Sequence, residues 1–169
     1  GEPLDEVLER RPLTAHEVCE LFIPLCGALE EAHERGIIHR DIKPANVLLS
    51  QYGAQLSDFG IARIAGAHET RAGVITASIA HACPEVLNGD RPTVVADVYS
   101  LGCVLYECLA GERPFERESE LALVYAHLND PPAPITDLRP ELPVAFDSVM
   151  AIALAKAPDD RFATCGELV

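Results

Sequence analysis

Apolar side chains recur three or four positions apart in five stretches of the chain, and this spacing predicts five amphipathic helices. The stretches are residues 4–11, the run from Thr14 to Gly36, the run from Thr93 to Gly111, residues 118–128 and residues 144–155. The segments between them are rich in Gly, Pro, Ser and Thr, which is typical of turns and loops. Most of the chain is therefore expected to be helical.

The second stretch has a signal at each end. Thr14 followed by Glu17 forms a capping box, in which the two residues satisfy each other's backbone N–H groups. Gly36 is typical of the residue that follows a helix. Pro24 lies inside the stretch and removes one backbone hydrogen bond, so a kink is expected there.

The third stretch has few charged residues and is expected to be a buried helix with Thr93 as its N-cap. Asp97 lies near its start. A buried carboxylate must find hydrogen-bond partners, because burying an unpaired charge costs a large free energy. We therefore expect Asp97 to bind other parts of the chain.

A short apolar run, residues 47–49, predicts a strand, and residues 55–57 are predicted to form a second short strand. Tyr52 and Gly53 lie between them, so the runs are expected to pair as a hairpin. The predicted fold class is α+β and mainly α-helical, with one small β-hairpin. The length of 169 residues, with no repeat and no linker, predicts one domain over residues 1–169.

Two other segments are expected to be loops. Residues 61–83 are rich in Gly, Ala, Thr and Ser and have no sustained period, so a mobile loop is predicted. Its hydroxyl side chains are Thr70, Thr76 and Ser78. Residues 131–134, Pro-Pro-Ala-Pro, fit either an SH3-type ligand or an ordered loop, and the ordered loop is the preferred interpretation.

The chain carries 13 basic and 27 acidic residues, a net charge of −14. This argues against nucleic acid or an anionic membrane as the main partner, because both select basic surfaces. The acidic surface would attract basic substrate segments or would simply aid solubility. We see no run of about 18 uncharged apolar residues that predicts a membrane span and no signal-peptide pattern. Six cysteines without a C-x-x-C pair predict buried thiols, a reducing compartment and a cytoplasmic location.

Polar residues with catalytic potential cluster around the predicted hairpin. Residues 39–49 are His-Arg-Asp-Ile-Lys-Pro-Ala-Asn-Val-Leu-Leu, and residues 58–60 are Asp-Phe-Gly. The hairpin would hold Asn46 and Asp58 close together, as a shared metal site requires. An Asp for a hydroxyl proton, a Lys for phosphate, and Asn plus Asp for Mg²⁺ are parts of a phosphoryl-transfer site.

The order H-R-D-x-K-x-x-N followed by D-F-G resembles the catalytic loop and metal-binding motif of the eukaryotic-type protein kinases. Lys43 matches the serine/threonine type of that loop. Cys83-Pro84-Glu85 resembles the family's Ala-Pro-Glu motif, and the segments 97–102 and 154–162 resemble its central helix and closing motif. The alanine-rich composition resembles that of bacterial members of the kinase family. The resemblance covers nearly the whole chain and implies the C-terminal (large) lobe of the kinase fold.

The resemblance implies ATP-dependent phosphorylation of protein serine and threonine hydroxyls, with ATP and Mg²⁺ as cofactors. By position, Asp41 would orient the acceptor hydroxyl and Lys43 would neutralise the γ-phosphate. Asn46 and Asp58 would hold Mg²⁺. Leu48 would form the apolar floor of the adenine pocket, a role compatible with an ordinary core position.

The same resemblance implies regulation through the predicted loop. Arg40 would pair with a phosphorylated loop residue, and an ordinary surface arginine is the alternative. Thr70 is the expected first phosphorylation site and Thr76 the second. Ser78 would bridge the catalytic Asp and Lys. His81 stands where the family usually has Tyr.

The resemblance assigns structural roles to five further residues. His39 would stack with Phe59 in an apolar spine. Glu85 would form a buried ion pair with Arg161. Asp97 would accept backbone hydrogen bonds from the catalytic loop.

The sequence holds no motif of a kinase small lobe. No G-x-G-x-x-G occurs, and the only lysines are Lys43 and Lys156, so none precedes His39. We therefore expect a partial kinase domain that belongs to a longer kinase. Two function classes stay open, namely serine/threonine phosphotransfer by the complete kinase and a non-catalytic interaction module formed by a lone lobe. The isolated chain is expected to be inactive.

Overall fold

The computed structural model of the chain describes residues 1–59 and 79–169. Helices dominate this part of the chain, and a small sheet accompanies them, so the predicted mainly helical α+β fold is confirmed. Most of the predicted loop, with Thr70, Thr76 and Ser78, lies outside the described residues. The elements in chain order are β1 (Glu2–Pro3), α1 (Leu4–Leu8), α2 (Ala15–Glu34), η1 (Pro44–Asn46), β2 (Val47–Ser50), β3 (Gly53–Leu56), α4 (Pro84–Leu87), α5 (Val94–Ala110), α6 (Glu120–Asn129), α7 (Ile135–Leu138), α8 (Ala145–Ala153), η3 (Pro158–Asp160) and η4 (Cys165–Leu168).

Helix α2 begins at the predicted capping box. The Thr14 side chain accepts a hydrogen bond from the Glu17 N–H at 3.2 Å, and the Thr14 N–H donates to Glu17 Oε2 at 2.9 Å. The helix continues across Pro24, so the proline does not end it. One face of α2 is buried in the core through Val18, Leu21, Phe22, Leu25, Cys26 and Leu29.

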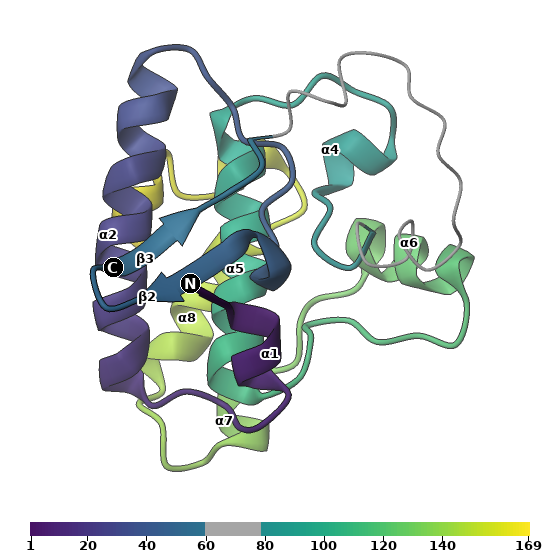
Figure 1. Cartoon of the computed structure of the whole chain (residues 1–169). Coiled ribbons are helices and arrows are strands. Elements are labelled where there is room, and N and C mark those ends of the chain that lie inside the picture. The colour runs from purple at the N-terminus through teal and green to yellow at the C-terminus, as the bar shows by residue number, and fades with distance from the viewer. Residues whose placement is uncertain (60–78) are drawn as a thin grey trace.

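Helix α5 lies beside α2 at the centre of the molecule (Figure 1) and is buried over most of its length. Thr93 precedes it, but the Thr93 side chain makes no capping hydrogen bond. Instead its backbone carbonyl accepts from the Ala96 N–H at 3.0 Å. Gly111 ends the helix with φ of +82°, a conformation that glycine adopts without strain. The two central helices thus form the frame on which the other elements pack.

The sheet has the order β1-β2-β3, with all neighbours antiparallel. Strands β2 and β3 form the predicted hairpin, with Val47 opposite Leu56 and Ser50 opposite Gly53. Strand β1 was not predicted, and it pairs with β2 through Glu2 opposite Leu49. The hairpin lies against α2 (Figure 1), so the residues at its base are held close to the helical core.

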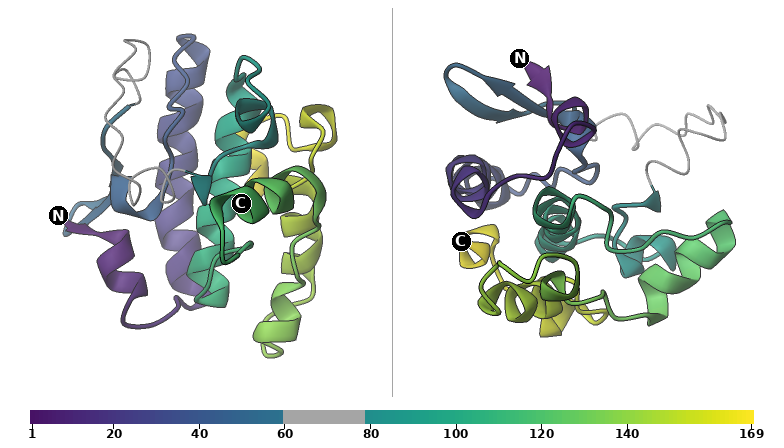
Figure 2. Two further views of the ribbon diagram at one scale, coloured as in Figure 1. Left: turned by 90° about the vertical axis from the view of Figure 1, so that its right-hand side faces the viewer. Right: turned by 90° about the horizontal axis from the view of Figure 1, so that it is seen from below.

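The remaining helices pack on the other sides of this frame. Figure 2 shows, in the view from below, that α6 and the hairpin lie on opposite sides of α5. Helix α1 ends at Leu8 and is shorter than the predicted stretch 4–11. Helix α6 begins after Ser119, whose side chain accepts from the Ala122 N–H at 3.2 Å. Among the described residues, no helix is both long enough and apolar enough to cross a membrane.

Candidate active site

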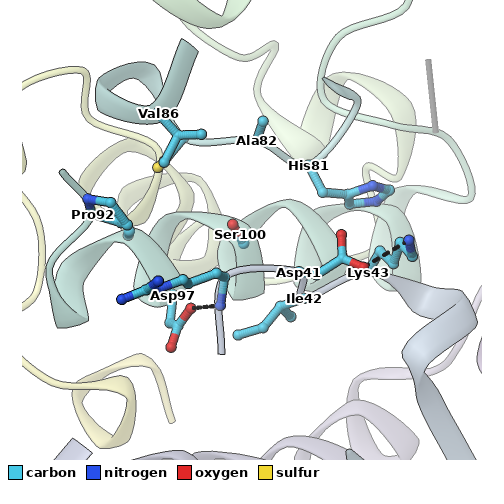
Figure 3. A pocket seen from close by; sticks show the side chains of 12 residues that line it. Asp41, Ile42, Lys43, His81, Ala82, Val86, Pro92, Asp97 and Ser100 are labelled. Atoms are coloured by element: carbon cyan, nitrogen blue, oxygen red, sulfur yellow. Dashed lines mark hydrogen bonds and ion pairs between the residues drawn. The ribbon is translucent and has the colours of Figure 1, made fainter. Parts of the chain in front are cut away.

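The loop between α2 and β2 is held in place by Asp97 at the start of α5. Asp97 Oδ2 accepts from the His39 N–H at 2.8 Å, and Oδ1 accepts from the Arg40 N–H at 2.9 Å. His33 Nε2, on α2, lies 2.8 Å from Asp97 Oδ2. Asp97 is fully buried, and Figure 3 shows it beside the segment that carries Asp41 and Lys43. The expected contacts of Asp97 are present, whereas His33 was not predicted.

The His39 ring is packed under this loop. Its Nε2 donates to the Ser57 carbonyl at 3.1 Å, and its Nδ1 accepts from the Asp41 N–H at 3.3 Å. Burial lowers the pKa of His39, although the nearby Asp97 carboxylate opposes this. The expected contact with Phe59 is present, with 4.5 Å between the ring centroids. A neutral, fully engaged ring supports a structural role.

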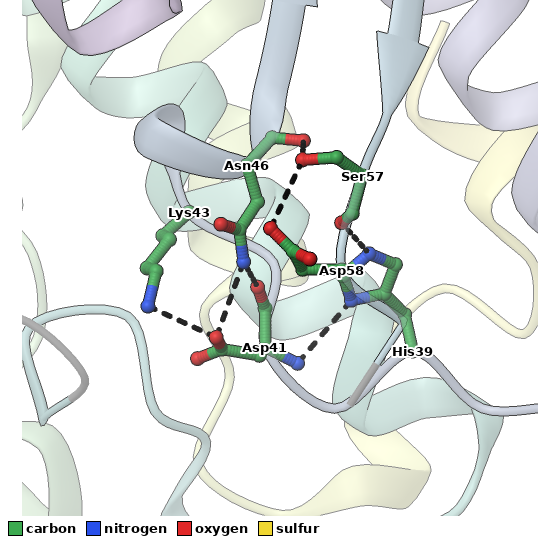
Figure 4. Close-up of polar contacts among 6 residues, drawn as sticks. All are labelled: His39, Asp41, Lys43, Asn46, Ser57 and Asp58. Atoms are coloured by element: carbon green, nitrogen blue, oxygen red, sulfur yellow. Dashed lines mark hydrogen bonds and ion pairs between the residues drawn. The ribbon is translucent and has the colours of Figure 1, made fainter. Parts of the chain in front are cut away.

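Asp41, Lys43 and Asn46 meet in one hydrogen-bonded cluster (Figure 4). Lys43 Nζ donates to Asp41 Oδ2 at 2.9 Å. Asn46 Nδ2 donates to the same oxygen at 3.1 Å and to the Asp41 carbonyl at 2.8 Å. Arg40, the residue before Asp41, has φ of +68°, a left-handed conformation that is uncommon for a residue with a side chain. Strained backbone of this kind is found most often at functional sites.

The hairpin brings Asp58 to the other side of Asn46. The Ser57 N–H donates to the Asn46 carbonyl at 2.9 Å, and Ser57 Oγ lies 3.5 Å from Asp58 Oδ2. Figure 4 shows the Asp58 carboxylate near the Asn46 side chain. Asp58 also has a left-handed backbone, with φ of +55°.

Asn46 and Asp58 fit the requirements of a magnesium ion. Both Asn46 hydrogen bonds to Asp41 use Nδ2, so the amide oxygen Oδ1 is directed elsewhere and can act as a ligand. Mg²⁺ prefers oxygen ligands and is usually held by one or two protein groups together with water and substrate phosphates. An amide oxygen and an exposed carboxylate provide such a pair.

The other predicted site residues lie around this cluster. Leu48 lies on β2 and is partly buried. This position is compatible both with the floor of an adenine pocket and with an ordinary core residue. Arg40 is exposed to solvent. The predicted phosphorylation sites, Thr70 and Thr76, and the bridging Ser78 are outside the described residues.

The buried ion pair expected between Glu85 and Arg161 is present. Arg161 Nη1 and Nη2 each donate to one Glu85 carboxylate oxygen at 2.8 Å, and the Arg161 side chain is fully buried. Arg161 also donates to the carbonyls of Ala155 and Lys156. Desolvation raises the pKa of Glu85, but the hydrogen bonds from Arg161 outweigh it and the pKa is lowered. The pair joins α4 to the C-terminal segment.

A second polar contact near the site was not predicted. His81 Nε2 lies 2.8 Å from Glu107 Oε2, and both side chains are largely buried. The two residues are 26 positions apart, and no local pattern connects them. In the sequence, the one sign of a special contact here was His81, which stands where the family usually has Tyr.

Comparisons with known proteins identify the family of the chain. The family model described as protein kinase domain matches residues 1–166. Serine/threonine-protein kinase PknK of Mycobacterium tuberculosis is 46% identical over 167 residues, which are 96% of this chain and 15% of PknK. PknH of Mycobacterium bovis is 40% identical over 171 residues, which are 99% of this chain and 29% of PknH.

A solved structure has a similar fold. The crystal structure of a double mutant of the PknI kinase domain from Mycobacterium tuberculosis matches with a TM-score of 0.72 and 31% identity. The match covers 99% of this chain and 59% of the PknI chain. The chain thus spans less than a third of the length of PknK and PknH. It belongs to the protein kinase family, and its relatives are the eukaryotic-type serine/threonine kinases of bacteria.

Proposed function

We propose that this chain supplies the acceptor-binding and metal-binding half of a kinase active site, which transfers the γ-phosphate of ATP to serine or threonine hydroxyls of proteins. The observation that carries this proposal is the shared contact at Asp41 Oδ2. Lys43 Nζ and Asn46 Nδ2 both donate to that one oxygen, at 2.9 and 3.1 Å. A proton acceptor, a cation and an amide from one short loop are thereby held in a fixed arrangement.

In this proposal Asp41 acts on the acceptor hydroxyl. Its carboxylate accepts the hydroxyl proton while the hydroxyl oxygen forms the new bond to the γ-phosphorus, and the bond from that phosphorus to the bridging oxygen breaks, so that ADP leaves with this oxygen. The hydrogen bonds from Lys43 and Asn46 orient the carboxylate before the acceptor arrives. Such preorganisation is a main resource of phosphoryl-transfer enzymes, because the transition state is stabilised chiefly by positioned charges.

Lys43 has two functions in the proposal. Its ammonium group contacts Asp41 and also supplies positive charge to the transferred phosphate. Asn46 and Asp58 would hold Mg²⁺, which when bound neutralises negative charge on the ATP phosphates. The backbone contact between Ser57 and Asn46, at 2.9 Å, sets the spacing of the two metal-binding residues.

The proposal is tested with Asp58→Ala in the kinase that contains residues 1–169. The measurement is incorporation of labelled phosphate from Mg²⁺–ATP into a general protein acceptor, followed by identification of the labelled residue. We expect labelled serine or threonine with the unchanged kinase and at least a ~10²-fold lower rate with Asp58→Ala, because a metal ligand is lost.

The matched control is Asp137→Ala, which removes an exposed carboxylate on α7 and should leave the rate unchanged. A normal rate with Asp58→Ala would contradict the assigned metal site. Absence of serine and threonine labelling with the unchanged kinase would contradict the proposed reaction.

A further inference from the structure

His127 lies on α6, and its ring is fully buried against the central helix α5. Its Nδ1 is hydrogen-bonded to the Tyr99 hydroxyl, on α5, at 2.9 Å. The ring also packs edge-on against Phe115, with 4.9 Å between the ring centroids. The imidazole therefore anchors α6 to α5 through one polar and one apolar contact.

The second ring nitrogen, His127 Nε2, is buried and has no hydrogen-bond partner within residues 1–59 and 79–169. Buried polar side-chain atoms are nearly always hydrogen-bonded, so this exception requires an explanation. The partner of Nδ1 is a neutral hydroxyl, so no carboxylate of these residues is hydrogen-bonded to the ring. A proton added to His127 would thus create a buried charge without a counter-ion in contact.

Basic side chains surround the His127 ring. Lys156 Nζ donates to the carbonyl of Ala126, the residue before His127, at 3.2 Å. The Arg161 guanidinium lies 4.9 Å from the centre of the phenol ring that bonds His127. His81, in the segment before α4, is a third basic group close enough to oppose a charge on His127.

The acidic side chains of this region already have other partners. Asp130, directly after α6, contacts Arg117 at 2.8 Å. Glu107, on α5, lies 2.8 Å from His81 Nε2. Protonation of His127 in its buried position is therefore uncompensated, and burying an unpaired charge costs a large free energy.

These surroundings determine how the position of α6 depends on pH. Burial lowers the pKa of His127 to about 3, and the interactions with Lys156 and His81 act in the same direction. A solvent-exposed histidine titrates near its ordinary pKa of about 6.5. Between these two values a state with α6 opened binds one proton more than the closed state. Closure of α6 is thus fully favoured above pH 6.5 and weakens by up to about tenfold per pH unit as the pH falls.

The other buried histidines do not act on α6 in this way. His33 and His81 each face a carboxylate, of Asp97 and Glu107 respectively, at 2.8 Å. A proton gained by either ring has a counter-ion in contact. His39 is also buried without such a pair, but it lies in the loop between α2 and β2. The uncompensated site on α6 is therefore His127.

Helix α6 is placed so that it can open by itself. It lies at the edge of the molecule, away from α2 (Figure 1). Its buried side contributes Leu123 and Ala126 to a small apolar cluster with Phe115 and Ala80, which is separate from the main core. Elements with few buried apolar contacts open locally at a lower free energy than the core does.

We propose that His127 makes α6 an acid-sensitive element, which is closed on α5 at neutral pH and opens as the pH falls towards 5 while the α2–α5 frame stays folded. Opening would release Ala80 from the small apolar cluster. The residues that follow it, 81–83, line one pocket together with Asp41, so the change would reach the candidate active site. The inference concerns the packing of α6 and goes beyond the proposed function.

Hydrogen exchange at the backbone amides of α6 tests this inference. The kinase that contains residues 1–169 is measured at pH 7 and pH 5, and each rate is divided by the intrinsic exchange rate at the same pH. The opening equilibrium of α6 should rise roughly twentyfold to thirtyfold, the factor that follows from pKa values of about 6.5 and 3. The amides of α5 should stay more protected than those of α6 at both pH values.

His127→Asn is the matched variant. The Asn amide lies near the position of Nδ1, so it can keep the hydrogen bond to Tyr99, and it cannot gain a proton. Its α6 opening should change by less than about threefold between pH 7 and pH 5. The readout is a ratio within each protein, so a constant loss of stability cancels. His127→Gln is a second neutral variant with the same expectation, and His16→Asn, at an exposed position on α2, should keep the full pH dependence.

Three results would overturn the inference: equal α6 opening at pH 7 and pH 5 in the unchanged kinase, an undiminished pH dependence in the neutral variants, or α6 and α5 amides that exchange together. The unchanged kinase alone gives the first and the third of these results, whatever the stability of the variants. The measurement reads backbone exchange and not phosphorylation, so none of these results bears on the proposed function.

Discussion

Asp97 shows how a residue outside the Asp41–Lys43–Asn46 cluster determines the geometry of the site. One buried carboxylate accepts hydrogen bonds from the His39 and Arg40 backbones and contacts the His33 side chain. The strained backbone of Arg40 is stabilised by one of these bonds. The position of Asp41, the next residue, therefore depends on the first turns of α5.

The Glu85–Arg161 pair provides a residue-scale prediction. Glu85→Gln leaves the Arg161 charge buried without its partner, so we expect the free energy of unfolding to fall by about 3–5 kcal/mol. Urea unfolding of the purified chain measures this change. Glu112→Gln, at an exposed position, is the matched control and should change the free energy by less than about 0.5 kcal/mol.

The effect of Glu85→Gln should also depend on pH. Arg161 holds the pKa of Glu85 below its usual 4.5, although desolvation opposes it. A carboxylate with a lowered pKa stabilises the folded state above its usual pKa and loses this contribution as the pH falls. The difference in the free energy of unfolding between the unchanged chain and Glu85→Gln should therefore shrink below about pH 4.5. A difference that stays constant into acid would contradict the assigned ionisation.

Contacts were predictable where the residues are close together in the chain, or where the family resemblance named both partners, as for Glu85 with Arg161 and for Asp97. Asp41, Lys43 and Asn46 lie within six positions, and a single loop conformation brings them into contact. His33 and Glu107 were missed because their partners are 64 and 26 positions away. Only the packed helices reveal those contacts.

At the scale of elements, helix α2 was predictable because its capping box and Gly36 mark both ends. Strand β1 was not predictable, because it has two residues and exists through pairing with β2. Helix α1 ends earlier than its apolar pattern suggests. Thr93 was expected to cap α5 with its side chain, and its backbone carbonyl does so instead.

Helix packing gives a prediction at the scale of elements, which compares two glycines that lie in helices. A methyl group added at Gly102 on α5 would lie 3.0 Å from Ala153 Cβ and 3.2 Å from Leu154 Cδ2. Gly102→Ala should therefore overpack the contact between α5 and α8 and cost about 1–3 kcal/mol. Gly27→Ala on α2 meets no atom within 4 Å and should stabilise the helix by about 0.5–1 kcal/mol.

Thermal unfolding of both glycine variants checks the packing prediction. The two substitutions add the same methyl group, so propensity acts in the same direction in both. We expect Gly102→Ala to lower the stability and Gly27→Ala to raise it. A stabilising Gly102→Ala would show that α5 and α8 are packed less tightly than the structure indicates.

At the scale of the whole molecule, the site is formed on one side of the α2–α5 frame. The loop between α2 and β2 and the hairpin supply Asp41, Lys43, Asn46 and Asp58. The sequence supplies no glycine-rich phosphate loop and no lysine before His39. Binding of ATP phosphates depends on charges and backbone N–H groups on both sides of the nucleotide.

The 169-residue chain by itself should therefore bind Mg²⁺–ATP with negligible affinity. Calorimetric titration of the purified chain measures this directly, and circular dichroism of the same sample establishes that it is folded. We expect no saturable heat at micromolar nucleotide. Low-micromolar binding would show that the loop and hairpin suffice to hold the nucleotide.

The central claim of this account is that Asp41 acts on the acceptor hydroxyl while Asn46 and Asp58 hold the metal. The most direct test is kcat of Asp41→Asn in the kinase that contains residues 1–169, with Asp137→Asn as the matched control. We predict that kcat falls by about 10²–10⁴-fold, the range of general-base catalysis, while Mg²⁺–ATP affinity is retained. A near-normal kcat with Asp41→Asn would contradict the claim.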